Sequence, residues 1–334
     1  MRFAVVGAGA IGGYLGARLA LAGEDVTFIA RGANLAAIRR DGFKLIEADG
    51  AERIAPGVRA HAIDEPGDYD VIFLAVKAQQ VAALAKDVAR LLRPNTAVVT
   101  LQNGVPWWFF HKLAGPYEGR SIHVVDPDGV TAANIPADSI IGSVVYPAAE
   151  LIAPGVVKLI EGDRFSLGEP DGTKSERISA VSEALTRSGL RAPVSSDIRA
   201  EIWLKLWGNV VFNPVSALTQ ATLAEICQFP TTRALAAAMM SEAQAVGEKL
   251  GVRVRISIEK RIAGAEAVGA HKTSMLQDVE SGRPLELETL VGSVVELARL
   301  TETPTPSIDA IYACASLLAK TLGDDGRLAI ERRG

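Results

Sequence analysis

A glycine-rich turn near the start of the chain limits the possible fold more than any other feature. Residues 2–7 form a short apolar run that predicts a buried strand, and the run passes directly into Gly7-Ala-Gly9-Ala-Ile-Gly12. Residues 14–22 follow with helical periodicity. A strand, this glycine spacing and a helix, in that order, predict the first βαβ unit of a dinucleotide-binding sheet. We therefore expect an α/β fold with a Rossmann-type doubly wound sheet at the N-terminus.

The glycine spacing also indicates how a dinucleotide is held. The first glycine makes the tight turn, the second lets the pyrophosphate approach the backbone, and the third lets helix and strand pack closely. The N-terminus of the helix adds free N–H groups and the positive end of its dipole. The residues predicted to contact the cofactor here are Gly7, Ala8, Gly9, Ala10, Ile11 and Gly12.

The end of the second predicted strand indicates which dinucleotide is bound. Residues 25–30 form this strand, and Arg31 follows it where an NAD enzyme usually places an acid. No acidic residue lies between Val26 and Arg40. Because an arginine suits a 2′-phosphate, the sequence favours NADPH over NAD or FAD. An ordinary exposed loop arginine is the alternative interpretation.

Polar residues also follow two later strands. Lys77 comes after the apolar run 71–76, and Asn103 comes after the run that starts at Ala97. Ligands of open α/β sheets bind at the carboxyl ends of the strands. We therefore predict that Lys77 reaches the cofactor phosphates or ribose and that Asn103 lies near the nicotinamide. A capped strand end is the alternative for both residues.

The middle of the chain predicts a mixture of short elements. The aromatic segment 107–110 could pack within the protein or form one wall of the substrate site, and we favour packing. The other elements expected are a helix at 80–92, a hairpin within 43–60, short strands within 121–167 with turns at 126–129 and 153–155, and a helix at 175–188.

Strand signals end near residue 197. The helices expected beyond it include 232–250, 259–268, 286–301 and 309–322. We therefore predict two domains, a Rossmann NADP-binding domain over residues 1–196 and an all-α substrate domain over residues 197–330.

One helix of the second part carries an unusual stripe. Lys205, Asn209 and Asn213 stand at i, i+4 and i+8, so a helix places them on one face, while nearly all other residues from 202 to 212 are apolar. Buried polar groups need partners, so this stripe predicts a surface that grips a small, oxygen-rich ligand. Pro214 is expected to end or kink the helix. An amphipathic helix with a thin solvent face is the alternative.

The composition excludes several classes of protein. A formal net charge of -4 gives no electrostatic reason to expect a nucleic acid or an anionic membrane as partner. We see no signal peptide and no apolar run of membrane-spanning length. Cys227 and Cys314 are expected to be reduced, which fits a cytoplasmic location. The four histidines lack metal-ligand spacing, so no metal is expected.

A last polar segment, Ser274–Asp278 followed by Glu286, lies between two predicted helices. Taken alone, Ser274 and Asp278 could be helix caps, and Glu286 could belong to a charged first helical turn. The other motifs that carry a resemblance are Gly7–Gly12, Arg31, Val76-Lys77, Gln102–Gly104, and Lys205 with Asn209 and Asn213-Pro214. In this order, and spanning both predicted domains, these motifs together resemble the ketopantoate reductase family across nearly the whole chain.

The resemblance implies a function and a site. It implies NADPH-dependent reduction of 2-dehydropantoate to pantoate for pantothenate synthesis, in a cleft between a Rossmann domain and an all-α domain. Lys205 is then the general acid. The substrate's hydroxyl and carboxylate are held by Asn209, Asn213 and Ser274. The remaining residues implied at the cofactor or the substrate are Asn103, Glu286 and Ala149, the last through its backbone.

Two departures from the family pattern leave the substrate open. Val291 stands where the family usually has an asparagine, and the region between Asn103 and Lys205 is longer than in compact members. Another branched 2-oxo acid is therefore an alternative substrate. A non-catalytic NADPH-binding regulatory protein is the alternative from a different class, although it would need neither Lys205 nor the asparagines. A monomer or a homodimer is expected.

Overall fold

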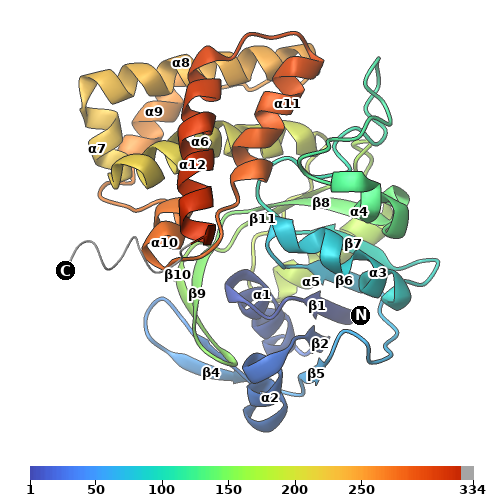
Figure 1. The fold of residues 1–334 in the computed structure, drawn as a ribbon. Helices are drawn as coiled ribbons and strands as arrows, with labels where there is room; N and C mark the ends of the chain where they lie inside the picture. Colours follow the sequence, from blue (N-terminus) through green and yellow to red (C-terminus); the bar gives the residue numbers. More distant parts are fainter. Residues whose placement is uncertain (325–334) are drawn as a thin grey trace. The chain divides into compact units, whose positions relative to one another are not determined.

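The computed structural model describes residues 1–324, which form two compact units (Figure 1). The sheet unit consists of Met1–Gln102, Pro106–Ser121 and Asp126–Glu201. The helical unit consists of Asn103–Val105, Ile122–Val125 and the chain from Ile202 onward. The predicted helical domain ends at residue 330, and residues 325–330 lie outside the described part of the chain.

The sheet unit is built on a seven-stranded sheet with the order β11-β8-β7-β6-β1-β2-β5. All neighbouring strands are parallel except β11, which is antiparallel to β8. The chain moves outward from β1 through β2 to β5, then returns and continues through β6, β7 and β8. This is the strand order of a Rossmann-type doubly wound sheet, and the predicted fold class is confirmed. The strands are β1 (Arg2–Val6), β2 (Asp25–Ile29), β5 (Arg59–His61), β6 (Val71–Leu74), β7 (Ala97–Thr100), β8 (Ile140–Val145) and β11 (Phe165–Gly168).

The central strands are continuous apolar runs because a parallel sheet is buried on both faces. Every residue of β6 and β7 is buried, and only the first residue of β1 is exposed. Across the sheet, the rings of Phe3 and Phe73 stack with centroids 5.7 Å apart. Gly16 lets helix α1 (Ala10–Leu21) approach closely, since an added Cβ would lie 2.5 Å from the ring of Phe28.

Five α-helices belong to the sheet unit, and three of them confirm predicted helices. They are α1 (Ala10–Leu21), α2 (Gly32–Asp41), α3 (Val81–Leu91), α4 (Val130–Asn134) and α5 (Glu176–Arg187). The predictions at 14–22, 80–92 and 175–188 correspond to α1, α3 and α5. Ser175 caps α5 by accepting a hydrogen bond from the N–H of Ile178 at 3.2 Å.

A second, four-stranded sheet has the order β4-β3-β10-β9. The predicted hairpin is confirmed, because β3 (Phe43–Ile46) and β4 (Glu52–Ala55) pair in antiparallel fashion. Strand β10 (Val156–Glu161) pairs with β3 in parallel and with β9 (Ala148–Ala153) in antiparallel fashion. Helix α1 packs against β9 and β10.

The expectation of short strands, separated by turns, within residues 121–167 is wrong for the first part of that stretch. Residues 127–139 form 3-10 turns and α4 instead. The carboxylate of Asp126 accepts hydrogen bonds from the N–H groups of Thr131 and Ala132 at 2.7 and 2.9 Å. These contacts satisfy free N–H groups of a short helix, which the local sequence alone did not reveal.

The aromatic segment 107–110 is packed inside the sheet unit, as predicted. Its four side chains are all buried, and Phe109 and Phe110 are fully so. The buried guanidinium of Arg199 donates hydrogen bonds to the carbonyls of Phe109, His111 and Pro170. The segment is therefore a structural part of the core.

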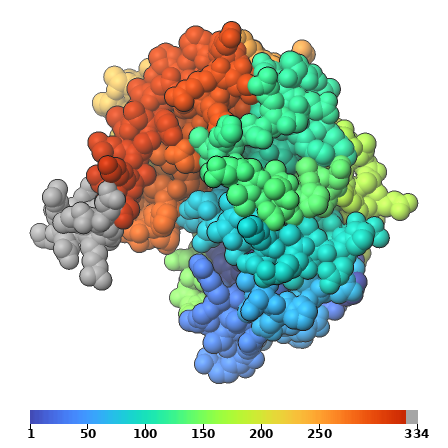
Figure 2. Space-filling view, turned by 45° about the vertical axis from the view of Figure 1, so that its right-hand side comes forward, coloured from blue at the N-terminus to red at the C-terminus, as the bar shows by residue number. Residues whose placement is uncertain are grey.

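The described residues of the helical unit contain helices and no named strand. The helices are α6 (Ile198–Thr219), α7 (Leu223–Gln228), α8 (Pro230–Lys249), α9 (Ile258–Ala267), α10 (Ser274–Glu280), α11 (Ser293–Leu300) and α12 (Pro306–Asp324). A π-helical turn at Glu288–Gly292 leads into α11. The predicted helices at 232–250, 259–268 and 309–322 are confirmed, and 286–301 divides into the π-helical turn and α11. In Figure 2, α12 lies at the surface of this unit, where Leu317 is exposed.

Helix α6 is held within its unit by two tryptophans. The indole N–H groups of Trp203 and Trp207 donate to the carbonyls of Ala243 and Met240 on α8, at 3.2 and 2.6 Å. Pro214 was expected to end or kink this helix, and it does not end it, because α6 continues to Thr219. A proline removes one N–H from the helical ladder, and the burial of the residues that follow Pro214 offsets this loss.

Candidate active site

The glycine-rich turn has the geometry of a phosphate cradle. Gly7 has φ +100°, which favours glycine, and an added Cβ at Gly12 would lie 2.1 Å from the carbonyl oxygen of Gly7. The backbone conformation and packing of this turn therefore require glycine at both positions. An added Cβ at Gly9 would meet no heavy atom within 4 Å. Gly9 thus borders open space, while the N–H groups that begin α1 at Ala10 have no side-chain cap.

Asn34 braces this turn, although no sequence pattern indicated this role. Its amide Nδ2 donates to the carbonyl of Ala8 at 2.6 Å, and its Oδ1 accepts from the N–H of Gly155 at 2.7 Å. Asn34 lies in α2, which follows Arg31, an exposed residue at the predicted end of β2. An asparagine in a first helical turn does not reveal a partner 121 positions away.

The carboxyl ends of β6 and β7 are joined by Gln102, which belongs to a matching motif but was given no role by the sequence analysis. The amide of Gln102 donates to the carbonyls of Leu74 and Val76 at 2.7 and 3.0 Å. Lys77 is partly buried directly beyond β6, where its N–H donates to Gln80 Oε1 at 3.2 Å. Ala149 lies in β9 of the four-stranded sheet and pairs with Leu159.

The helical unit brings together three residues predicted from distant parts of the sequence. Lys205 Nζ donates a hydrogen bond to Asn103 Oδ1 at 2.7 Å. Burial lowers the pKa of Lys205 to about 8, and the Glu286 carboxylate acts in the opposite direction. Lys205, Asn103 and Glu286 therefore form one polar cluster, which we call the lysine cluster.

Asn209 and Asn213 lie on the same face of α6 as Lys205. Residues 205, 209 and 213 lie in one uninterrupted helix, so Asn209 and Asn213 follow Lys205 along one face. Asn213 is 5% exposed and Asn209 is partly buried. Within residues 1–324 neither side-chain amide makes a hydrogen bond, so the donors and acceptors of both remain available to a ligand.

Ser274 is the first residue of α10 and is exposed. The interpretation of Ser274 as a helix cap is wrong, because Thr273 is the N-cap and accepts from the N–H of Leu276 at 3.2 Å. Asp278 likewise does not cap a helix start; it pairs with Arg283 at 2.8 Å. The described residues show no hydrogen bond between Ser274 and the lysine cluster.

The departure from the family pattern at Val291 lies in the core. Val291 is completely buried within the π-helical turn. One residue of the same turn, Glu288, accepts hydrogen bonds from the hydroxyl of Tyr312 at 3.1 and 2.9 Å. Burial, followed by the Glu288 carboxylate, raises the pKa of Tyr312. A side chain with no exposed surface does not contact a ligand, so Val291 belongs to the packing of this unit.

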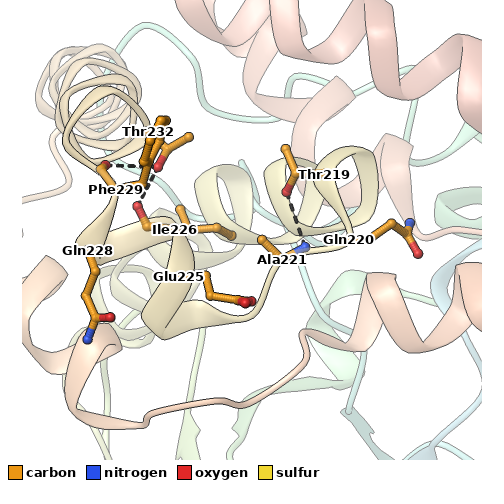
Figure 3. Close-up of a pocket in the computed structure, with 8 residues that line it drawn as sticks. All are labelled: Thr219, Gln220, Ala221, Glu225, Ile226, Gln228, Phe229 and Thr232. Carbon is orange, nitrogen blue, oxygen red and sulfur yellow. Dashed lines mark hydrogen bonds between the residues drawn. The ribbon is translucent and has the colours of Figure 1, made fainter.

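A separate hollow of about 680 Å³ in the helical unit contains none of the predicted residues (Figure 3). It is lined by Thr219, Gln220, Ala221, Glu225, Ile226, Gln228, Phe229 and Thr232. In residues 1–324 no three His, Cys, Asp or Glu side chains are placed to hold a metal ion. No helix in that range is long and apolar enough to cross a membrane.

The doubly wound sheet, the glycine cradle and the lysine cluster together define a dinucleotide-dependent oxidoreductase. Comparisons with known proteins identify the family. Residues 3–172 match the family described as ketopantoate reductase PanE/ApbA, and residues 197–319 match its C-terminal region. The chain belongs to the ketopantoate reductase family, as its sequence motifs indicated.

Several relatives cover nearly the whole chain. A 2-dehydropantoate 2-reductase of Mesorhizobium japonicum is 53% identical over 97% of this chain and 99% of its own length. Another from Archaeoglobus fulgidus is 30% identical over 88% of this chain and 90% of its own. The crystal structure of a 2-dehydropantoate 2-reductase from Methylococcus capsulatus has a TM-score of 0.83 at 26% identity, with 96% of this chain and 98% of that chain covered.

Proposed function

We propose that this protein reduces 2-dehydropantoate to pantoate with NADPH and that Lys205 is the general acid. The observation that carries the proposal is the lysine cluster, in which a buried ammonium with a lowered pKa lies 2.7 Å from an amide oxygen. The names of the relatives, at up to 53% identity over nearly the full chain, support the substrate.

The sheet unit fits a dinucleotide. The open space beside Gly9 and the uncapped N–H groups at the start of α1 suit a pyrophosphate. We assign the 2′-phosphate to Arg31 because a guanidinium binds phosphate oxygens in bidentate fashion. Lys77, the backbone of Ala149, Asn103 and Glu286 are proposed to complete the contacts. When bound, NADPH supplies the hydride that the carbonyl carbon receives.

Lys205 provides the proton that balances this hydride. As the carbonyl is reduced, negative charge develops on its oxygen, and a proton donated by Nζ turns that oxygen into the hydroxyl of the product. A pKa of about 8 keeps the amine protonated at neutral pH and makes it a stronger acid than an ordinary lysine. Asn103 orients the ammonium, because its Oδ1 accepts a hydrogen bond from one of the three N–H groups.

The asparagines and Ser274 are assigned to the rest of the substrate. Amides both donate and accept, so Asn209 and Asn213 are suited to orient a hydroxyl and a carboxylate. The exposed hydroxyl of Ser274 is not used as a cap, which leaves it for the same purpose. These roles rest on the family resemblance together with the unused hydrogen-bonding capacity of the two amides.

The presence of Val291 in place of the family's asparagine was the main reason to consider another 2-oxo acid as substrate. Because Val291 is buried, we interpret this replacement as a change in packing and not in substrate contacts. A non-catalytic regulatory role is disfavoured because a sensor of NADPH does not need a buried lysine beside unused amides. We further propose a domain that binds the dinucleotide over residues 1–196 and a substrate domain over residues 197–330, in a cytoplasmic monomer or homodimer.

The test compares the reduction of a panel of 2-oxo acids, followed by NADPH oxidation, in the wild type and in Lys205→Ala. We expect 2-dehydropantoate to be the best substrate of the wild type. Loss of a general acid lowers kcat by about 10²–10⁴, while the variant remains folded and binds NADPH. A Lys205→Ala protein that retains substantial kcat would show that this lysine is structural.

Lys249→Ala is the matched control. Lys249 is an exposed lysine of the helical unit that is also held by a hydrogen bond, because its Nζ donates to the carbonyl of Thr301 at 2.8 Å. It has no role in the proposed chemistry, so kcat should stay at the wild-type value. If Lys249→Ala lowers kcat as much as Lys205→Ala does, the loss reflects damage to the unit and not the removal of an acid.

A further inference from the structure

A three-residue segment supplies the hydrogen-bond acceptor of Lys205. Asn103–Val105 belongs to the helical unit, although the residues on both sides of it in the chain belong to the sheet unit. We call this segment the strap. Its first residue, Asn103, accepts the hydrogen bond from Lys205 Nζ. The position of that amide therefore depends on what holds the strap within the helical unit.

The strap is held against one residue of the π-helical turn. The N–H of Val105 donates to the carbonyl oxygen of Thr289 at 3.0 Å, and Val105 is 1% exposed. Gly104 has φ +87°, and an added Cβ would lie 2.2 Å from the same oxygen and 3.0 Å from Thr289 Cβ. Gly104 is thus required twice, by its left-handed backbone and by the backbone contact.

The same residue of the π-helical turn is tied to Glu286. Thr289 Oγ1 donates a hydrogen bond to the main-chain carbonyl of Glu286 at 3.4 Å. The N–H of Leu290 donates to the same carbonyl at 3.3 Å. The Thr289 carbonyl also accepts from Ser293 Oγ at 2.8 Å, which fixes its direction. Glu286 is the carboxylate that acts on Lys205. The contact between Gly104 and Thr289 therefore sets the spacing of the two groups that act on the lysine.

We propose that Gly104 is a positioning residue for the reduction, acting through Asn103 by allowing the strap to lie directly on the Thr289 carbonyl. The inference rests on the proposed role of Lys205. A side chain at position 104 pushes the strap off the π-helical turn and withdraws the Asn103 oxygen from Nζ. The ammonium then loses an acceptor that stabilises its protonated form, and the acid loses its orientation.

The first experiment measures the pH dependence of kcat in Gly104→Ala. A misplacement of about 1 Å lowers a rate by about 10²-fold, so we expect kcat to fall about tenfold to hundredfold. The pH at which kcat declines on the alkaline side should move lower, because a lysine without its acceptor releases its proton more readily. The assay uses the full-length protein at saturating NADPH and 2-oxo acid.

Gly251→Ala is the matched control. Gly251 has φ +79° in the same unit, and an added Cβ there would meet no heavy atom within 4 Å. This variant carries the same backbone strain without the clash. We expect wild-type kcat and an unmoved alkaline decline. If Gly104→Ala behaves like Gly251→Ala while Lys205→Ala is inactive, the positioning role is wrong and the proposed function stands.

A double-mutant comparison separates positioning from general damage. Asn103→Ala removes the acceptor without changing the backbone, so it should lower kcat and move the alkaline decline in the same direction. If Gly104 acts through Asn103, adding Gly104→Ala to Asn103→Ala should cause little further loss. An equal loss of kcat in both backgrounds, with the alkaline decline unmoved, would make Gly104 merely structural.

Ser293→Ala keeps the proposal testable if Gly104→Ala does not fold. It removes only the second donor to the Thr289 carbonyl, so that oxygen gains freedom to move. A smaller loss of kcat is expected, with a shift of the alkaline decline in the same direction. If Ser293→Ala changes neither quantity and Gly104→Ala is unfolded, the proposal is rejected.

Discussion

The ammonium of Lys205 and the side-chain oxygen of Asn103 lie 2.7 Å apart, although the two residues are 102 positions apart in the sequence. The amide oxygen is a neutral acceptor, so it orients the ammonium and favours the protonated form less strongly than a carboxylate would. Burial is then the larger influence and lowers the pKa of Lys205 to about 8. This relationship makes the proton on Lys205 sensitive to pH in an accessible range.

The rate of ketone reduction should therefore depend on pH. Lys205 donates a proton, so kcat should be constant below about pH 8 and fall as the pH rises through that value. The reverse oxidation needs the unprotonated amine and should rise over the same range. The measurement is kcat at saturating substrate and cofactor from pH 6 to about 10 in both directions. A forward kcat that stays flat to the alkaline end contradicts the assignment.

The free energy of unfolding should also depend on pH, because the pKa of Lys205 is lowered in the folded protein. Lys205 has a pKa of about 8 in the folded protein against 10.5 ordinarily, so between these values the unfolded chain holds a proton that the folded protein has released. Its contribution to the free energy of unfolding therefore rises with pH across that window, and below pH 8 the cost of burying the charge is fully present.

Lys205→Met removes this cost. Its free energy of unfolding at pH 7 should exceed the wild-type value by about 1–3 kcal/mol. The difference should shrink towards pH 10, because only the wild type gains stability there. Urea denaturation of both proteins at several pH values measures the difference, in which all other titrating groups cancel. A difference that is constant with pH would show that Lys205 keeps its ordinary pKa.

Two alanine substitutions should separate the glycines needed by the fold from the one reserved for the cofactor. Gly9→Ala adds a methyl group where no atom lies within 4 Å, so the thermal stability without cofactor should be unchanged. Affinity for NADPH should nevertheless fall, because the methyl group occupies the space for the pyrophosphate. Gly12→Ala should lower stability even without cofactor, since its Cβ would lie 2.1 Å from the Gly7 carbonyl. Equal effects of Gly9→Ala and Gly12→Ala on stability would contradict this.

Arg31→Ala should change the cofactor preference. Loss of a charge-assisted hydrogen bond to the 2′-phosphate weakens NADPH binding by about 1.5–3 kcal/mol. NADH lacks that phosphate, so its binding should hardly change. Dissociation constants of both cofactors can be measured by titration of nicotinamide fluorescence. Equal weakening of both would remove the assignment of Arg31 to the phosphate.

Local signals predicted most of the fold. The glycine spacing after a buried strand indicated the sheet, and the apolar runs of β6 and β7 marked its centre because parallel strands are buried on both faces. The turns and helix at 127–139 were missed, because they depend on the capping contacts of Asp126. The continuation of α6 past Pro214 was also missed, because it depends on burial of the residues that follow.

The residues of the candidate site could be predicted one by one, but their contacts could not. Lys205 was recognised by its stripe and Asn103 by its place after a strand, while their hydrogen bond depends on tertiary structure. Asn34 and the role of Gln102 were missed because each side chain acts on main-chain carbonyls of another element. Such partners carry no side-chain chemistry, so they leave no pattern in the sequence.

The membership of the strap in the helical unit bears on how this protein can be divided and recombined. A gene segment that starts at Ile202 encodes Lys205 without Asn103, and also without Ile122–Val125, whose His123 and Val124 N–H groups are bound by Glu296 at 2.8 and 2.9 Å. Chimaeras made by a single crossover near residue 200 would therefore join a lysine from one parent to an amide from another. A faithful exchange requires three pieces of coding sequence to travel together.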